Sequence, residues 1–183
     1  MPAHETETET DDAIKALVMT TPLRIVFVCT GNICRSPTAE GVLRQLATTQ
    51  GLAHRIEVAS AGLEGRHAGA PPDERSQTHA LARGYDLAAQ RAQHFTARDF
   101  EHFDWVIAMD AGHYHGLRRL CPPQHTHKLK RAADFSERVP AGGVPDPYYG
   151  EAGGFEEVLD LVEAVCEGVL VQVRGAGSAG EVA

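Results

Sequence analysis

Residues 29–36 read Cys-Thr-Gly-Asn-Ile-Cys-Arg-Ser, and this segment constrains the fold more than any other part of the chain. It follows an apolar run at residues 25–28 and precedes Pro-Thr-Ala-Glu at residues 37–40, which is typical of a helix start. This order predicts a buried strand, a tight loop and a helix. The five residues between Cys29 and Arg35 let the backbone curl around a tetrahedral anion, with loop N–H groups and the helix N-terminus facing the negative charge.

The residue types in this loop suit phosphate chemistry. Arg35 has a planar guanidinium that can donate to two phosphate oxygens at once. Cys29 lies beside that cation and the helix N-terminus, so its sulfur is expected to be ionised and nucleophilic near neutral pH. Ser36 can donate to the sulfur, and Gly31 and Asn32 tolerate the backbone of a tight loop. The alternative is a structural cysteine and a surface arginine, which the framing strand and helix start disfavour.

Length and charge exclude several classes of protein. The 183 residues fit one domain, and the net charge of −8 disfavours nucleic-acid binding and a polybasic membrane patch. No apolar run approaches the ~20 residues of a spanning helix, and no signal peptide is recognisable. We expect an acidic flexible tail over residues 1–22, the domain over 23–174 and a flexible end over 175–183. Four cysteines without a disulfide framework indicate a cytoplasmic location, with export lacking a recognisable signal left open.

Strands and helices alternate along the chain. The predicted strands are 24–29, 56–60, 105–109 and 128–132. The predicted helices are 37–49, 73–83, 96–103, 111–120 and 155–174, and a long Gly/Pro-rich loop covers 139–154. The alternation predicts a single α/β domain with a parallel sheet flanked by helices on both faces. Ligands bind such sheets beyond the carboxyl ends of the strands, where the cysteine loop lies.

A candidate proton donor lies in the long loop, in Val-Pro-Asp-Pro-Tyr-Tyr-Gly at residues 144–150. A phenol has a pKa near 10, so loss of an unprotonated phenolate is slow. Asp146 is the candidate acid because two prolines restrict the backbone around it, and Tyr148 and Tyr149 can wall a slot for an aromatic ring. Taken alone, the segment fits an ordinary turn. Together with the cysteine loop it favours catalysis.

Four motifs give the chain a resemblance to low molecular weight protein tyrosine phosphatases over residues 23–173. They are Val-Cys-Thr-Gly-Asn-Ile-Cys-Arg-Ser-Pro at 28–37, Ser-Ala-Gly at 60–62, Met-Asp at 109–110 and Asp-Pro-Tyr-Tyr-Gly at 146–150. The resemblance implies a four-stranded parallel sheet, no metal or other cofactor, and hydrolysis of phosphotyrosine through a phosphocysteine. The expected partners are a phosphotyrosine protein substrate and a cognate tyrosine kinase, and we expect a monomer.

The same resemblance implies roles for individual residues. Cys29 is the nucleophile, Arg35 the phosphate clamp and Asp146 the general acid and base. The phosphate-binding residues are Thr30, Gly31, Asn32, Ile33, Cys34 and Arg35; the supporting residues are Ser36, Ser60 and Asp110; the pocket residues are Arg66, Tyr148 and Tyr149. Cys34 resembles a second loop cysteine that can protect Cys29 as a disulfide, and a cysteine packed inward fits the sequence equally well.

Three departures from the family pattern involve four positions. Arg66 stands where Trp or Tyr is frequent, so a guanidinium that stacks on the substrate ring and favours acidic flanking residues is expected. Gln90 and Gln93 stand where a His and an Arg often support the loop, and an amide here is expected to hydrogen-bond Asn32. Leu63 stands at a common Thr position, for which the sequence offers no explanation.

Three alternative functions fit the same residues less well. An arsenate reductase of this fold lacks the acid loop and needs a cysteine relay, which Cys121 and Cys166, read as structural, do not provide. An arginine phosphatase typically has Thr at the position of Ile33, whose larger side chain favours a flat phenyl phosphate. A phosphotyrosine-binding module would fit if Cys29 or Asp146 were missing, and both are present.

Two further patterns have simple interpretations. His-Tyr-His at 113–115 and His-Thr-His at 125–127 lack the acid or cysteine spacing that would complete a metal site, so they are predicted to be surface histidines. The last helix is predicted to bury one apolar stripe, formed by Val158, Leu159, Leu161, Val162, Val165 and Val169.

Overall fold

The computed structural model describes residues 9–14 and 21–178, and predictions for the other residues lie outside this range. Its centre is a four-stranded sheet with the order β2-β1-β3-β4 and all neighbours parallel. The strands are β1 (Leu23–Cys29), β2 (Ile56–Gly62), β3 (Trp105–Ala108) and β4 (Leu129–Arg131). The predicted parallel α/β sheet is confirmed, and each strand begins and ends within two residues of its predicted bounds.

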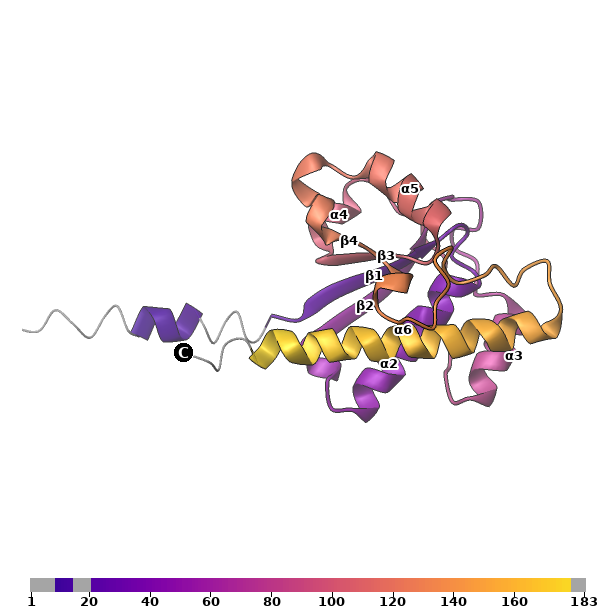
Figure 1. The fold of residues 1–183 in the computed structure, drawn as a ribbon, viewed down its shortest axis with the longest axis horizontal. Coiled ribbons are helices and arrows are strands. Elements are labelled where there is room, and N and C mark those ends of the chain that lie inside the picture. The colour runs from indigo at the N-terminus through magenta and orange to yellow at the C-terminus, as the bar shows by residue number, and fades with distance from the viewer. Residues whose placement is uncertain (1–8, 15–20, 179–183) are drawn as a thin grey trace, which may run out of the picture.

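Helices cover both faces of the sheet, with α2, α3 and α6 below it and α4 and α5 above it in Figure 1. They are α2 (Arg35–Thr49), α3 (Glu74–Ala82), α4 (Asp99–His102), α5 (Ala111–Leu120) and α6 (Ala152–Ser178). Short 3₁₀ turns are η1 (Ala53–Arg55), η2 (Pro123–Lys128) and η3 (Ala132–Asp134). Residues 9–14 are helical and exposed. Within the described ranges, no helix combines the length and apolar character needed to cross a bilayer.

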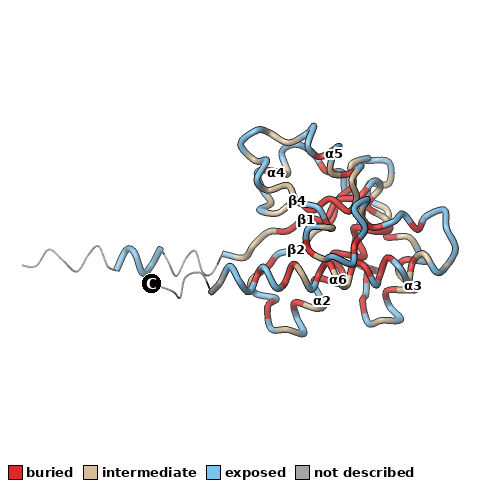
Figure 2. The backbone as a smooth tube through the Cα atoms, in the orientation of Figure 1, coloured by how far each residue is buried: buried red, intermediate tan, exposed pale blue. Residues whose placement is uncertain are grey.

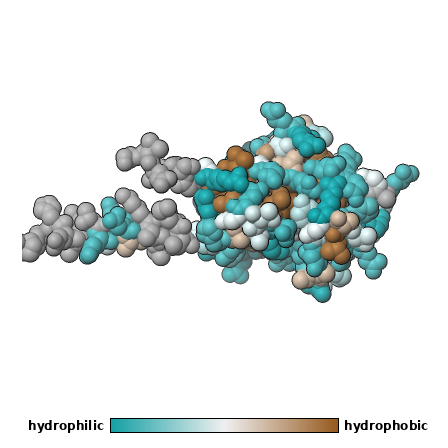
Figure 3. Space-filling view, turned by 90° about the horizontal axis from the view of Figure 1, so that it is seen from below, coloured by the Kyte–Doolittle hydropathy of each residue, from teal (hydrophilic) through white to brown (hydrophobic). Residues whose placement is uncertain are grey.

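Burial in β1 explains its uninterrupted apolar sequence. Ile25 and Phe27 pack with residues of α2 and α6, whereas Val26 and Val28 pack with residues of α4 and α5, and all four are fully buried. A strand covered on both faces needs apolar side chains at successive positions. Figure 2 shows this buried core along the strands and the inner sides of the helices. The predicted apolar stripe of α6 is also buried. By contrast, the molecular surface seen in Figure 3 is mainly hydrophilic, with scattered hydrophobic areas.

The loop before α6 is tied to the end of β3. Val144 donates its N–H to the carbonyl of Met109 at 2.9 Å. Gly143 has φ +98°, and a Cβ at this position would lie 2.4 Å from the Cα of Asp110, so glycine is required there. These contacts hold the segment that carries Asp146 at the carboxyl end of the sheet.

Three helices differ from their predicted bounds by two or more residues at one or both ends, and α3 by one residue at each end. α4 is shorter than predicted because the Asp99 carboxylate accepts the N–H of Thr96 at 2.7 Å and forms a turn before the helix. α2 begins at Arg35, two residues before the predicted start. α6 begins at Ala152, inside the predicted loop, and continues to Ser178, past the predicted end at residue 174. Burial does not explain the added C-terminal turn, because residues 174–176 are exposed.

Candidate active site

The loop after β1 brings the predicted nucleophile to the carboxyl end of the sheet. β1 ends at Cys29 and α2 begins at Arg35, so residues 30–34 form the turn between them. The Cys29 residue is 3% exposed and lines a cavity of about 230 Å³. The lining residues are Cys29, Thr30, Gly31, Ile33, Cys34, Arg35, Glu64, Arg66, His67, Asp146, Tyr148 and Tyr149. The predicted cysteine, arginine and aspartate therefore converge with both pocket tyrosines.

Asn32 holds the loop from inside the protein. Its φ of +57° makes it the one described non-glycine residue with a left-handed backbone. Its Oδ1 accepts the backbone N–H of Gln93 at 2.9 Å, which sets the orientation of the amide because a backbone nitrogen only donates. Nδ2 therefore donates to Oγ of Ser36 and to Oγ of Ser60, each at 2.9 Å. Asn32 is 3% exposed, so these bonds are shielded from water.

The two serines extend this network in opposite directions. Because each accepts a hydrogen bond from Asn32, each keeps its own hydroxyl proton to donate. Ser60 donates to Oε1 of the buried Glu40 at 3.1 Å. Ser36 Oγ lies 2.9 Å from the Cys29 sulfur, and a backbone carbonyl at 3.4 Å is the more distant acceptor. The chain of donors thus directs the Ser36 proton at the sulfur.

Arg35 is a buried cation whose orientation is set by the protein. Its Nη1 donates to Oδ2 of Asp110 at 2.7 Å and to the carbonyl of Val144 at 3.0 Å. Its Nη2 lies 3.3 Å from Nε2 of His113 and 3.6 Å from Oδ2 of Asp146. The side chain of Arg35 is only 5% exposed. These contacts support the predicted placement of Asp110 beside the loop.

His113 is a residue that the sequence prediction placed wrongly on the surface. It is 4% exposed and lies in the first turn of α5, where Asp110 accepts its backbone N–H at 2.8 Å. Its Nε2 lies 2.9 Å from Oγ1 of Thr30. Burial and the charge of Arg35 lower the pKa of His113 to about 4. The sequence signal for this burial is the spacing between Asp110 and His113, because a residue three positions after an N-cap turns back toward the cap.

Asp146 lies at the mouth of the cavity, where its side chain is 47% exposed. Its Oδ1 accepts the backbone N–H of Tyr148 at 3.1 Å, while its Oδ2 is the oxygen near Arg35. Tyr148 and Tyr149 meet edge to face with ring centroids 4.8 Å apart. The guanidinium of Arg75 lies 5.4 Å from the centre of the Tyr148 ring. The two rings thus form an aromatic border beside the carboxylate.

The loop after β2 supplies a second part of the mouth. Arg66 has a 70% exposed side chain and forms an ion pair with Glu64. His67 lies against the cysteine loop, since a Cβ on Gly31 would be 2.9 Å from its ring. The mouth therefore carries an exposed cation whose charge is partly neutralised by an adjacent carboxylate.

The other cysteines differ from Cys29 in environment. Cys34 is buried and lines the same cavity, and burial raises the pKa of its thiol to about 12. Cys166 is fully buried and donates to the carbonyl of Ala39 at 3.6 Å. Cys121 is half-buried, and all four thiols are free. Cys34 is therefore a neutral thiol near neutral pH in this structure.

The prediction that a glutamine side-chain amide hydrogen-bonds Asn32 is wrong, because the donor is a backbone N–H. Asn32 receives the backbone N–H of Gln93, whereas the Gln93 amide donates to the carbonyl of Ser60 at 2.8 Å. The Gln90 amide donates to the carbonyl of Pro37 at 2.9 Å. The main chain of Gln93 thus supplies the contact to Asn32, and both glutamine side chains instead donate to backbone carbonyls.

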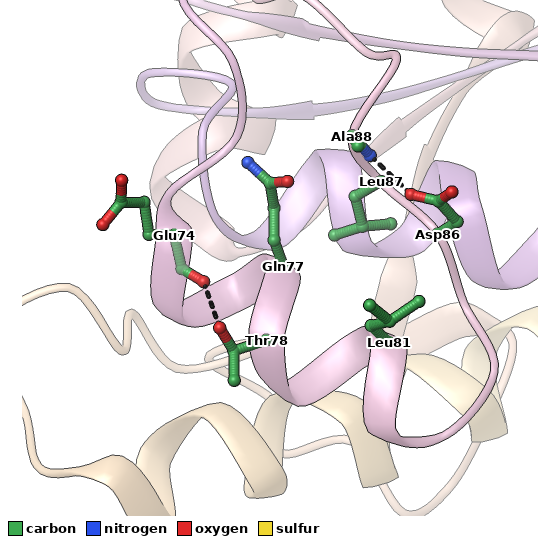
Figure 4. A pocket seen from close by; sticks show the side chains of 7 residues that line it. All are labelled: Glu74, Gln77, Thr78, Leu81, Asp86, Leu87 and Ala88. Atoms are coloured by element: carbon green, nitrogen blue, oxygen red, sulfur yellow. Dashed lines mark hydrogen bonds between the residues drawn. The ribbon is translucent and has the colours of Figure 1, made fainter.

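A second hollow, of about 420 Å³, lies beside α3 (Figure 4). It is lined by Glu74, Gln77, Thr78, Leu81, Asp86, Leu87 and Ala88. These side chains include no thiol, imidazole or guanidinium, so the chemistry of the Cys29 cavity has no counterpart there. In the part of the chain that the structure describes, no group of three or more His, Cys, Asp or Glu side chains could hold a metal ion.

The fold and the site define a class of α/β proteins. Its members have a thiol at the base of the loop after the first strand, beside a buried arginine and a carboxyl group. The family model described as low molecular weight phosphotyrosine protein phosphatase matches residues 24–179. The chain belongs to this family, whose members are phosphoric monoester hydrolases.

Individual relatives cover nearly the same region. The low molecular weight protein-tyrosine-phosphatase of Streptomyces coelicolor is 45% identical over 154 residues, which are 82% of this chain and 93% of that protein. YfkJ of Bacillus subtilis is 40% identical over 152 residues, 83% of this chain and 96% of its own. A crystal structure of the Entamoeba histolytica protein tyrosine phosphatase, with Hepes in its active site, has a TM-score of 0.81 and 34% identity, covering 84% of this chain and 98% of that one.

Proposed function

We propose that this chain hydrolyses phosphotyrosine monoesters of proteins through a phosphocysteine formed on Cys29. The observation that carries the proposal is the convergence of a buried thiol, a buried guanidinium and a partly exposed carboxylate on one small cavity. Membership of the family supports the class of reaction. The contacts of Cys29, Arg35 and Asp146 support their separate roles.

In the first step, the Cys29 thiolate attacks phosphorus while the loop N–H groups and Arg35 hold the phosphoryl oxygens. A sulfur–phosphorus bond forms as the bond from phosphorus to the tyrosine oxygen breaks. Asp146, protonated at this stage, gives its proton to the departing oxygen. The 3.6 Å separation of the Asp146 carboxylate from the Arg35 guanidinium supports this role, because a proton donor must lie next to the phosphate site.

In the second step, water attacks the phosphorus of the phosphocysteine. The Asp146 carboxylate takes a proton from that water, and the sulfur–phosphorus bond breaks to release phosphate and the thiolate. Ser36 supports both steps, since its hydroxyl lies 2.9 Å from the sulfur and can donate to it as nucleophile and as leaving group. Its orientation by Asn32 keeps this donor in place without reorganisation.

The mouth of the cavity supports an aromatic substrate. Tyr148 and Tyr149 border it with an apolar edge that can contact the ring of a phosphotyrosine. Ile33 adds an aliphatic side chain to the lining, which suits a flat phenyl phosphate better than a polar phosphoguanidine. Arg66 adds an exposed positive charge, which favours substrates with acidic residues next to the phosphotyrosine.

A leaving-group series tests the proposal. Cys29→Ser is expected to abolish turnover of all phosphate esters. Asp146→Ala should lower kcat/KM, which reports on formation of the phosphocysteine, by about 10²–10⁴ for phenyl phosphate, and much less for p-nitrophenyl phosphate, whose leaving group needs no proton. Glu151→Ala is the matched control, because this exposed carboxylate lies in the same loop but does not line the cavity. Equal losses of the Asp146 variant on both esters would remove it from the acid role.

A further inference from the structure

His113 contacts two residues of the cysteine loop, and the two steps above leave it without a role. Its Nε2 lies 2.9 Å from Oγ1 of Thr30 and 3.3 Å from Nη2 of Arg35. On the other side of the ring, Nδ1 lies 3.2 Å from Oδ1 of Asp110 without forming a hydrogen bond to it. The residue is 4% exposed, so water does not compete for these contacts.

The chemistry of these neighbours determines the protonation of the ring. A guanidinium can only donate, so the nitrogen that faces Arg35 must present its lone pair, and the Thr30 hydroxyl can donate to the same lone pair. The single proton of the neutral ring then lies on Nδ1, facing the Asp110 carboxylate, where a bare lone pair would be repelled. Burial first, and then the charge of Arg35, lower the pKa of His113 to about 4, while Asp110 and Asp146 act in the opposite direction.

We propose that His113 is a positioning residue that, as the neutral Nδ1–H tautomer, orients Arg35 and Thr30 toward the bound phosphate. The proposal rests on the function proposed above. Protonation would place an N–H at Nε2 opposite the guanidinium and remove the acceptor that both loop residues use. Asp110 and the Val144 carbonyl hold Nη1 of Arg35 at any pH, whereas the His113 acceptor for Nη2 is present only while the imidazole is neutral.

Two substitutions separate this role from support of the fold. His113→Gln keeps a neutral acceptor, whereas His113→Leu has none. With sulfate as a non-reactive probe of the loop, we expect the Leu variant to bind about tenfold more weakly and to lose a similar factor in kcat/KM, since a hydrogen bond to a charged group is lost. The Gln variant should stay within about threefold of the parent. His115→Gln, at an exposed position of the same helix, is the matched control and should change neither value.

Nitrogen NMR of the imidazole and a pH series test the protonation state. Nδ1 is expected to carry the proton, and Nε2 none, from neutral pH to about pH 5. Because the folded pKa lies below the unfolded value near 6.5, the stability that the neutral ring contributes is complete above that value and is lost as the pH falls toward 4. His113→Gln should remove this part of the pH dependence of the unfolding free energy.

Several results would overturn the proposal. Equal weakening of sulfate binding in the Gln and Leu variants, or weakening in neither, would show that no acceptor is needed at this position. A proton on Nε2, or a charged ring at neutral pH, would contradict the tautomer. Sulfate binding and NMR do not depend on turnover, so an inactive parent protein with an intact sulfate site would count against the proposed function and leave the role of His113 in orienting the loop supported.

Discussion

The side chain of Asn32 offers a quantitative test of how the cysteine loop is held. It makes three buried hydrogen bonds, one from the main chain of Gln93 and one to each of Ser36 and Ser60. It also occupies a left-handed backbone conformation with φ +57°. Asn32→Gly removes the bonds and relieves the backbone, whereas Asn32→Ala removes the same bonds and keeps the backbone strained. The two variants therefore separate the two contributions.

The expected magnitudes follow from these contacts. At about 1 kcal/mol for each buried hydrogen bond, both variants should lose roughly 3 kcal/mol of unfolding free energy. A left-handed residue with a Cβ costs about 1–2 kcal/mol, and the greater freedom of glycine in the unfolded chain offsets about half of that. Asn32→Ala should thus be about 1 kcal/mol less stable than Asn32→Gly. Relative to the parent protein, the total loss in Asn32→Ala should lower the Tm by about 10 °C.

Urea unfolding measures these differences in stability, and kcat/KM on p-nitrophenyl phosphate reports whether the cysteine loop is ordered for catalysis. Gly84→Ala calibrates the backbone contribution, because Gly84 has φ +90° and a Cβ there meets nothing within 4 Å. Both Asn32 variants should lose activity under conditions where they remain folded, since Ser36 is no longer directed at the sulfur. Unchanged stability in Asn32→Gly, or full activity in both variants, would refute the view that this network orders the loop.

Three further predictions concern specificity, oxidation and packing. Arg66→Met should reduce kcat/KM for phosphotyrosine peptides with acidic flanking residues by about fivefold relative to neutral peptides, with p-nitrophenyl phosphate unaffected; an unchanged peptide preference would remove Arg66 from this role. Brief peroxide treatment should inactivate reversibly if Cys34 traps oxidised Cys29 as a disulfide, and recovery with thiols should be lost in Cys34→Ala; the same recovery in that variant would rule out the trap. Gly168→Ala should destabilise the fold by about 1–3 kcal/mol in urea unfolding, because a Cβ there would lie 1.9 Å from the carbonyl oxygen of Phe135. An unchanged free energy of unfolding would mean that α6 shifts freely.

Local patterns were sufficient to predict the sheet and the cysteine loop. An apolar run covered on both faces, a loop of fixed spacing and a Ser-Pro helix start are all contained in one continuous segment around Cys29. The convergence of Asp146 on the same site could be expected because it lies in the long loop before the last helix and the ligands of parallel sheets collect at one edge. Its approach depends on Gly143, whose close contact with Asp110 only the structure reveals.

Contacts between distant segments could not be predicted in this way. His113 lies 83 residues from its partner Thr30, and nothing in its own helix distinguishes it from the exposed His115 except its distance from the Asp110 cap. Leu63, unexplained by sequence, packs on α5, where a Cβ on Gly116 would lie 2.9 Å from its Cδ1. Such pairs depend on how β2 and α5 are brought together by the sheet, which no local spacing encodes.

The central claim is that phosphate passes through the sulfur of Cys29. The direct measurement is rapid acid quenching of Asp146→Ala during turnover of p-nitrophenyl phosphate, followed by mass spectrometry of peptides. In this variant the good leaving group departs without an acid, while hydrolysis of the phosphocysteine lacks its base, so the intermediate should accumulate. The account predicts phosphate on Cys29. Phosphate on Cys34, or a burst of nitrophenol with no phosphorylated residue, would contradict it.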